Sequence, residues 1–223
     1  MAEPPNEEGK DRFSIQNRLC TMELPGWFER TLTQVRSFDT LNKMEKHFNL
    51  GRFGAHLWTK EKGRQIRSQV AAVLDTLGTG DVLVIDAAGV EAFDFSFATE
   101  LFCKTLLTIG AEYPGRFLIV ENLTECASEN LEKALESLNV TIIERKRGKL
   151  MLVGKVHPTD QETFAEIVGA GDAVSAGALS RKLEVNLTAM NERLSKLTNL
   201  GVVRREKGSS GSGREQYVYR VLR

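Results

Sequence analysis

The chain is poor in cysteine and in aromatic residues, and both shortages exclude kinds of protein. Its 223 residues include only three cysteines, Cys20, Cys103 and Cys126, which are far apart and form no CxxC pair. This spacing indicates neither a disulfide framework nor a zinc site, and it favours a reducing intracellular compartment. Aromatic residues make up 7% of the chain, so no aromatic-rich ligand surface is predicted.

Long apolar segments are missing as well. No run approaches the ~20 apolar residues that cross a bilayer. The first residues, MAEPPNEE, are acidic and lack the apolar centre of a signal peptide. We therefore expect a cytoplasmic protein without membrane contact. Residues 1–12 have almost nothing to bury, which predicts a disordered tail.

Charge is balanced overall but unevenly distributed. The chain carries 30 Lys and Arg against 30 Asp and Glu. Residues 181–223, however, hold 10 basic and 4 acidic side chains, a net charge of +6. Positive charge gathered at one end predicts a polyanionic partner there, because each Lys or Arg placed near a phosphate releases counterions.

Buried-strand patterns alternate with helical patterns over much of the chain. Apolar runs predict strands at 82–85, 117–120, 140–143 and 149–153, and apolar stripes predict helices at 60–77, 95–109 and 127–138. This alternation is typical of a mostly parallel or mixed sheet covered by helices. We predict such an α/β domain over residues 13–153, with a linker at 154–158 opening a second domain over residues 154–223.

Local signals predict several boundaries. Thr59 is the expected N-cap of the first of these helices, and Gly110 is expected to end the second. Gly51 and Gly54 indicate a hairpin or bulge. Residues 145–148 are expected to form a polar turn between the last two strands. Further upstream, the pattern predicts a strand at 13–21 and short helices at 27–36 and 39–46.

The strand VLVID at 82–86 and the helix start FDFSFA at 93–98 together resemble the STAS domain, and in particular a STAS-like family of uncharacterised function. The helix start TKEKGRQIR at 59–67 is similar to that family too, and the resemblance covers residues 47–145. In anti-sigma-factor antagonists of this fold, a partner kinase phosphorylates a serine at the helix start. The resemblance therefore implies a protein partner and makes Ser96, with Asp94 beside it, the candidate switch.

A phosphate on Ser96 is compatible with a helix N-terminus, where free N–H groups and the positive end of the dipole favour negative charge. It would also block a docking surface. In this chain Asp94-Phe95-Ser96-Phe97 stands where the family has Asp-Ser-Ser-Gly. The alternative interpretation is structural: Ser96 caps the helix and Asp94 is a turn residue.

Candidate catalytic groups are few. Asp86 ends a buried strand, where α/β proteins often bind ligands, but no cluster joins it, Asp94 or Glu100 at metal-ligand spacing. We interpret Asp86 as a hydrogen-bonding turn residue. The three histidines are scattered, and the Gly51–Gly54 loop lacks the spacing of a phosphate loop. The sequence thus predicts no catalytic residue, no metal and no cofactor, and we do not expect an enzyme.

The end of the chain has the order helix, helix, turn, helix and hairpin. Pro158 starts the first helix, Ser175 caps the second, and Asn186 or Thr188 starts the third, whose apolar side is Met190, Leu194, Leu197 and Leu200. Gly201 ends the third helix, and strands from residue 202 and at 216–221 enclose a tip at 208–213 that is rich in Gly and Ser. This order predicts a winged helix-turn-helix, a module that commonly places one helix in the DNA major groove.

The segment from Leu197 to Arg205 resembles winged-helix repressors of the multiple-antibiotic-resistance type, in which leucine, glycine, valine and basic residues close the recognition helix into the wing. Asn191 fits recognition of adenine, and Lys196 fits contact with phosphate. Glu192 on the same face would be repelled by phosphate unless a basic neighbour or a cytosine amine pairs with it. The predicted DNA-contacting residues are Thr188, Asn191, Ser195, Lys196, Arg204, Arg205, Lys207 and Arg214.

Three functions are compatible with the sequence. The first is a DNA-binding regulator, in which the STAS-like domain senses a signal or binds a protein partner and the winged helix contacts duplex DNA. The second is an interaction adaptor of the anti-sigma-factor-antagonist kind, with the winged helix used for protein contacts. The third, an enzyme using Asp86 and Asp94, has the least support. We expect the first, as a homodimer that matches a two-fold DNA site.

Overall fold

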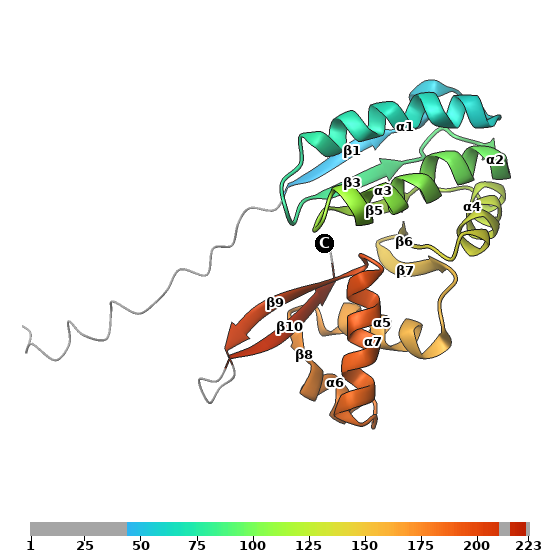
Figure 1. Ribbon diagram of the computed structural model, residues 1–223. Coiled ribbons are helices and arrows are strands. Elements are labelled where there is room, and N and C mark those ends of the chain that lie inside the picture. Colours follow the sequence, from blue (N-terminus) through green and yellow to red (C-terminus); the bar gives the residue numbers. More distant parts are fainter. Residues whose placement is uncertain (1–43, 210–214, 222–223) are drawn as a thin grey trace, which may run out of the picture. The chain divides into compact units, whose positions relative to one another are not determined.

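A five-stranded sheet organises the residues that the structure, a computed structural model, describes: 44–209 and 215–221 (Figure 1). Its first four strands are parallel, and the last is antiparallel to its neighbour. In spatial order they are β1 (Glu45–Asn49), β3 (Val82–Asp86), β5 (Phe117–Glu121), β6 (Thr141–Lys146) and β7 (Lys149–Gly154). A separate parallel pair joins β2 (His56–Leu57) to β4 (Ala92–Phe93). The prediction of a mixed α/β fold with a mostly parallel sheet is confirmed.

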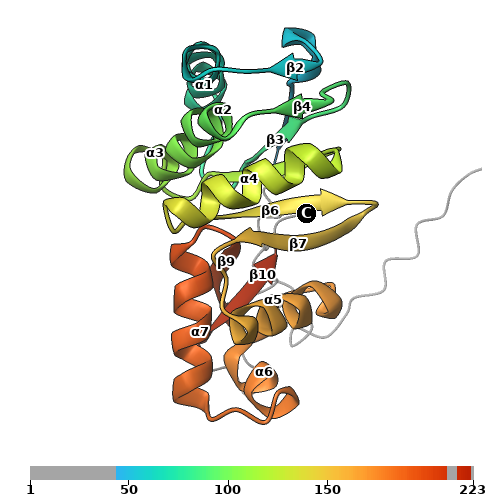
Figure 2. The ribbon, with the colours of Figure 1, turned by 90° about the vertical axis from the view of Figure 1, so that its right-hand side faces the viewer.

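One face of this sheet is covered by helices (Figures 1 and 2). They are α1 (Lys60–Asp75), α2 (Phe95–Ala98), the π-helical turn η2 (Thr99–Cys103), α3 (Lys104–Glu112) and α4 (Glu125–Ser137). Their apolar stripes share one hydrophobic cluster with Leu83, Ile85, Leu118 and Val120 of the central strands. Strands β3 and β5 form at the predicted positions, and their apolar runs are buried on both faces.

The helix starts agree with the local signals. Thr59 caps α1, since its side chain accepts a hydrogen bond from the Lys62 N–H. The expected helix over 95–109 is instead three helical segments in succession, because the π-helical turn η2 interrupts it. The prediction that Gly110 ends this helix is wrong, since α3 continues to Glu112. An internal glycine costs a helix only about 1 kcal/mol, which tertiary packing offsets here.

The predictions for residues 45–54 and for the β6–β7 turn differ from the structure. Residues 45 and 46, expected in a helix, belong to β1, and a 3-10 turn, η1 (Gly51–Phe53), follows where a hairpin or bulge was expected. At Gly51 an added Cβ would lie 2.1 Å from the carbonyl oxygen of Ala88, so only glycine fits this contact between the ends of β1 and β3. The β6–β7 turn is confined to Arg147 and Gly148, which both have positive φ, as two-residue hairpins favour.

The opposite face of the sheet packs against the C-terminal elements. These are α5 (Pro158–Ala170), β8 (Val174–Ser175), α6 (Ala176–Lys182), α7 (Leu187–Asn199), β9 (Val203–Ser209) and β10 (Glu215–Val221). Strands β8, β10 and β9 form an antiparallel sheet in that order. A second hydrophobic cluster combines Val84, Phe117 and Ile119 of the large sheet with residues such as Phe164 and Leu194 of the C-terminal helices.

This second cluster crosses the predicted boundary near residue 154, and all described residues belong to one compact unit, Asn42–Arg223. The two-domain division therefore stays a prediction. The expected tail at 1–12, the strand at 13–21, the helix at 27–36 and residues 39–43 of the next helix lie outside the described residues, as do Arg214 and most of the hairpin tip. Among the helices that the structure does describe, none has the length and apolarity of a membrane span.

Candidate functional site

Helix α7 has one buried and one exposed side. The Asn186 side chain caps it by accepting a hydrogen bond from the Ala189 N–H at 2.8 Å. Met190, Leu194 and Leu197 are fully buried, as the spacing predicts. Leu200, which follows the helix, is partly exposed. The apolar stripe therefore fixes which side of α7 is left to face outward.

The outward side of α7 carries the predicted contact residues together. Thr188, Asn191, Ser195 and Lys196 are all exposed and line a shallow hollow of about 620 Å³. Glu192 lines the same hollow. Small and polar side chains on a helix surface permit close approach to a partner, and amides and hydroxyls supply both donors and acceptors.

Basic residues of α7 are already paired with acids of α5. Lys196 forms an ion pair with Asp160, whose side chain is only 4% exposed. Arg193 lies 3.7 Å from a carboxylate oxygen of Glu162 and also contacts Thr163. These pairs orient α7 on α5 and compensate part of its positive charge, so the free cationic charge of this region lies mainly on the hairpin.

The hairpin β9–β10 presents two cations outward. Arg205 and Lys207 are exposed and alternate with residues of the opposite strand face. The guanidinium of Arg205 lies over the ring of Tyr217, 4.5 Å from the ring centroid. Tyr217 is itself 48% exposed and pairs in register with Lys207. Arg205, Lys207 and Tyr217 form what we call the hairpin patch.

Arg204 is placed differently from the predicted role. Its side chain is 12% exposed, because it turns toward the large sheet. There Nη2 donates a hydrogen bond to the carbonyl oxygen of Gly80, and the guanidinium lies over Phe117. The DNA contact of Arg204 stays a prediction; its side chain faces the large sheet because successive strand residues point to opposite faces and Arg205 occupies the outward one.

Asp94, not Ser96, caps helix α2. Asp94 Oδ1 accepts a hydrogen bond from the Phe97 N–H at 2.6 Å, and its Oδ2 accepts one from the Thr59 N–H at 3.0 Å. Ser96 is exposed at the second position of the helix. The alternative interpretation of Ser96 as the cap is thus wrong, and its hydroxyl is accessible. Exposed aromatic side chains flank this turn: Phe95 is 45% and Trp58 is 47% exposed.

Asp86 has the structural role that we interpreted from the sequence. Its Oδ1 accepts hydrogen bonds from the Ala88 N–H at 2.9 Å and from the Asn122 side-chain amide at 2.8 Å. Both bonds hold the loops that leave β3 and β5. The carboxylate therefore ties two strand ends together.

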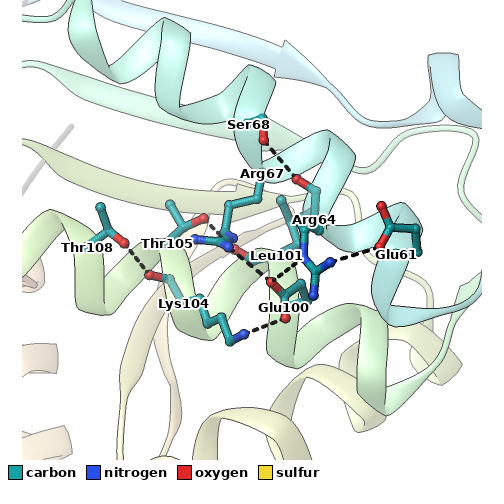
Figure 3. Close-up of polar contacts among 9 residues, drawn as sticks. All are labelled: Glu61, Arg64, Arg67, Ser68, Glu100, Leu101, Lys104, Thr105 and Thr108. Atoms are coloured by element: carbon teal, nitrogen blue, oxygen red, sulfur yellow. Dashed lines mark hydrogen bonds and ion pairs between the residues drawn. The ribbon is translucent and has the colours of Figure 1, made fainter.

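Glu100 is a buried carboxylate enclosed by cations (Figure 3). One oxygen accepts from Arg67 at 3.0 Å and the other from Lys104 at 2.6 Å, while Arg64 lies 3.8 Å away. Burial alone would raise the pKa of Glu100, but the hydrogen bonds and charges of Lys104 and Arg67 outweigh it and hold the pKa below its ordinary value. Glu100 therefore stays ionised and occupied by its partners, which suits a structural ion pair between α1 and η2.

Within the described ranges, 44–209 and 215–221, no three His, Cys, Asp or Glu side chains gather in a way that could hold a metal ion. Cys103 is buried and Cys126 is exposed, and both are free thiols. Burial raises the pKa of the Cys103 thiol to about 12. Such a thiol is a poor nucleophile, because the thiolate is the reactive form.

A pocket at the amino-terminal edge of the large sheet was not predicted from the sequence. Arg116 and Phe117, at the start of β5, line it together with Gly80 and with Arg204 and Arg205 of β9. The only signal in the sequence was the isolated Arg116 directly before an apolar strand. Gly80 is 36 residues away in the chain and Arg204 is 88 residues away, so no local pattern could associate them with Arg116.

The chain matches no protein-family model, and no curated protein is similar to it. Among solved structures, it is similar to a protein described as a possible transcriptional regulator from Methanosarcina mazei Go1, at 17% sequence identity and a TM-score of 0.28. The similarity covers 30% of this chain and 57% of that chain, so this chain spans little more than half the length of the solved structure. A likeness this weak establishes neither fold nor function.

Proposed function

We propose that this protein is a DNA-binding regulator in which residues 158–221 act as a winged helix-turn-helix and the preceding α/β part acts as a STAS-like module for a signal or a protein partner. The order α5, β8, α6, α7, β9, β10 supports the proposal, as does the strand order β8-β10-β9. In this arrangement α7 is the recognition helix, α6 is the first helix of the helix-turn-helix, and β9–β10 is the wing.

The observation that carries the proposal is the polar, exposed side of α7, which the other described residues leave uncovered. Thr188, Asn191 and Ser195 lie on it within about two helical turns. Asparagine can donate to and accept from an adenine edge in the major groove, while the hydroxyls suit either bases or phosphates. A helix with this surface and a buried apolar stripe is suited to enter the groove.

The hairpin patch supplies the backbone contacts. Arg205 and Lys207 are exposed cations on a two-stranded ribbon, and cations placed along phosphates contribute affinity without regard to sequence. Lys196 can add a phosphate contact only by sharing its charge with Asp160. We assign no DNA contact to Arg204, which is engaged with Gly80 and Phe117.

Two further features belong to the proposal. A homodimer would present two α7 helices to the half-sites of a two-fold DNA sequence. The α/β part is proposed to have no catalytic role, since the carboxylates of Asp86, Asp94 and Glu100 are each engaged in structural hydrogen bonds. Sedimentation of the full chain with a DNA duplex, at protein concentrations above the dissociation constant, would report two chains per duplex.

Fluorescence anisotropy of a labelled random-sequence duplex, titrated with the full chain at several salt concentrations, tests the proposal. We expect binding that weakens as salt rises. The double substitution Arg205→Ala with Lys207→Ala is expected to weaken binding to all sequences and to reduce the slope of log affinity against log salt by about 2, one for each lost phosphate contact.

Lys133→Ala is the matched control, because it removes one exposed positive charge from α4 and leaves the hairpin intact. It should leave the slope unchanged. Absence of duplex binding even at low salt would reject the DNA function. If Lys133→Ala, which removes one charge, reduced the slope by half as much as the double substitution, net charge alone and not the hairpin patch would govern binding.

The second candidate function is a protein-interaction adaptor, and one observation favours it. Ser96 is exposed, and two large aromatic side chains near this helix start are nearly half exposed: Phe95, its neighbour in the chain, and Trp58, which precedes the Thr59 that bonds to Asp94. Exposed aromatics of this kind are typical of interaction sites. A kinase that transfers phosphate to the wild-type chain but not to a Ser96→Ala variant would support the adaptor, whereas equal labelling of both proteins would remove Ser96 from consideration.

A further inference from the structure

A pocket of about 580 Å³ lies where the amino-terminal edge of the large sheet meets the β9 strand. Its walls come from the loops before β3 and β5, from the end of α7 and from the first residues of β9. Ligands of open α/β sheets usually bind at the opposite, carboxyl edge. This pocket is therefore unrelated to Asp86 and to the helix start at Asp94.

The walls of the pocket are cationic. Arg116, Arg204 and Arg205 line it, against a single lining acid, Glu206. Glu206 Oε1 lies 3.6 Å from Arg204 Nη1. Asp81 is a further acid nearby, but its carboxylate accepts hydrogen bonds from the Gly78 and Met44 N–H groups. The lining residues together carry an excess of positive charge.

Arg204 is the most constrained of these cations. Burial is the main cause that lowers the pKa of its guanidinium, and the neighbouring Arg220 acts in the same direction. Arg220 is the cross-strand partner of Arg204, so two cationic residues occupy opposite positions on one sheet face, and Arg220 Nη2 lies 3.4 Å from Asp172 Oδ1. The buried Nε of Arg220 finds no hydrogen-bond partner among the described residues. Like charges in this position repel each other, and the carboxylates of Glu206 and Asp172 compensate them in part.

An apolar recess adjoins the cationic pocket. It has a volume of about 200 Å³ and shares six lining residues with the larger pocket: Ile109, Gly110, Arg116, Phe117, Asn199 and Gly201. Apart from Thr141, the rest of its lining is aliphatic and includes Leu106, Leu107 and Val202. Leu107 is 52% exposed, which leaves the recess open at one side. The two compartments together are cationic at one end and apolar at the other.

We propose that these joined pockets bind a small amphiphilic anion, with its carboxylate between Arg116 and Arg204 and its apolar body in the recess beside Leu106 and Leu107. Bidentate hydrogen bonding to a guanidinium fits a planar carboxylate. The apolar body gains from removal of its surface from water. Pockets of this size range are typical of sites for small molecules.

Binding of such a ligand would directly affect the hairpin. Arg204 and Arg205 are consecutive residues, one facing the pocket from beside Gly80 and the other belonging to the hairpin patch. Occupancy of the pocket would therefore change the position of the residue next to a phosphate-contacting cation. This regulatory consequence rests on the proposed DNA function, whereas the binding site itself does not.

Isothermal titration calorimetry of the full chain, without DNA, tests the site. The probes are octanoate, which has both a carboxylate and an apolar chain, 1-octanol, which lacks the charge, and acetate, which lacks the chain. Octanoate is kept below the concentration at which it forms micelles. We expect saturable binding of octanoate with one site per chain, and binding of 1-octanol and of acetate at least about tenfold weaker, because each lacks one of the two interactions.

Two substitutions address the two compartments. Arg116→Gln should weaken octanoate binding about tenfold, and Leu107→Glu should abolish it by placing a negative charge at the exposed side of the recess. Lys133→Gln, which removes a charge far from the pocket on α4, should bind octanoate like the wild type. Circular dichroism melting of each variant establishes that it is folded.

Three results would overturn the site: no saturable heat with octanoate, equal binding of octanoate and 1-octanol, or wild-type affinity in both Arg116→Gln and Leu107→Glu. The DNA function is judged separately by the salt titration of the hairpin variants. A chain that binds octanoate but no duplex would support the pocket and reject the DNA function. A chain that binds duplex but not octanoate would support the DNA function and reject the pocket.

Discussion

The guanidinium of Arg204 lies over the aromatic ring of Phe117, with its central carbon 5.0 Å from the ring centroid. Phe117 begins β5 of the large sheet, and Arg204 is the second residue of β9. The same guanidinium donates a hydrogen bond to the Gly80 carbonyl oxygen. A cation over an aromatic ring and a charged hydrogen bond thus act together where the C-terminal hairpin meets the sheet.

Arg204→Ala is expected to lower the free energy of unfolding by about 1–2 kcal/mol, because it removes a partly buried cation–π contact and a hydrogen bond. Arg205→Ala, on the exposed face of the same strand, should change stability by no more than about 0.5 kcal/mol. Urea denaturation of the two variants measures both. Equal destabilisation by the two substitutions would contradict the opposite placement of these neighbours.

Glu100→Gln should destabilise the protein at neutral pH by roughly 1–3 kcal/mol, since it removes a carboxylate that accepts two charged hydrogen bonds. The pKa of Glu100 is held below its ordinary value of 4.5 in the folded protein. Its ionised form thus stabilises the fold above about pH 5, and this contribution is lost as the pH falls through the folded pKa. The stability difference between wild type and variant should shrink on acidification, as chemical denaturation at several pH values would measure.

Glu144→Gln is expected to act in the opposite direction. Glu144 is 3% exposed, and burial raises its pKa above the ordinary value of 4.5. The contribution of this residue is fully present below pH 4.5 and is lost as the pH rises through the folded pKa. At pH 7 the amide variant should therefore be more stable than the wild type, because it carries no charge at this buried position. The two proteins should converge at low pH, and a wild type that is the more stable at neutral pH would contradict the burial of an unfavourable charge.

Asn191→Ala should reduce discrimination between DNA sites more than it reduces affinity for random sequence. Loss of a base contact costs about 1–3 kcal/mol on the preferred site and little elsewhere. Selection of binding sites from a randomised pool, followed by affinity measurement on selected and scrambled duplexes, measures the ratio. A uniform loss across all duplexes would instead assign Asn191 to backbone contact or to folding.

Thiol labelling should distinguish the two described cysteines. In a Cys20→Ser background, one equivalent of an aromatic disulfide reagent should react rapidly with Cys126, which is exposed. Cys103 should react only after denaturation, because it is buried and its thiol pKa is raised to about 12. Two rapidly reacting thiols in the folded protein would show that the helix carrying Cys103 opens on the time scale of labelling.

The features that could be predicted from the sequence are those that a short stretch of residues determines by itself. Strands β3 and β5 are unbroken apolar runs, and α1 and α7 have regular apolar stripes with capping residues directly before them. Strand β1 was missed because it is an edge strand in which a single residue, Phe48, is buried. No alternating pattern can arise from one apolar side chain.

The candidate site shows the same limit. The periodicity of α7 placed Thr188, Asn191 and Ser195 on one exposed side, and the structure agrees. Strand alternation requires that Arg204 and Arg205 point to opposite faces, but which face meets the large sheet depends on Gly80, 124 residues away. The same holds for Ser96: two residues suited to capping lay two positions apart, and only the hydrogen bond that the Phe97 N–H donates to Asp94 Oδ1 decides between them.

The cover that the C-terminal helices give to Val84, Phe117 and Ile119 has a consequence for synthesis on the ribosome. The strands that carry these side chains leave the exit tunnel before the residues that will shield them. During that interval the nascent chain exposes an apolar sheet surface of the kind that chaperones recognise. Truncation after β7 would make this transient exposure permanent. We therefore expect the segments before and after the end of β7 to be retained together in evolution.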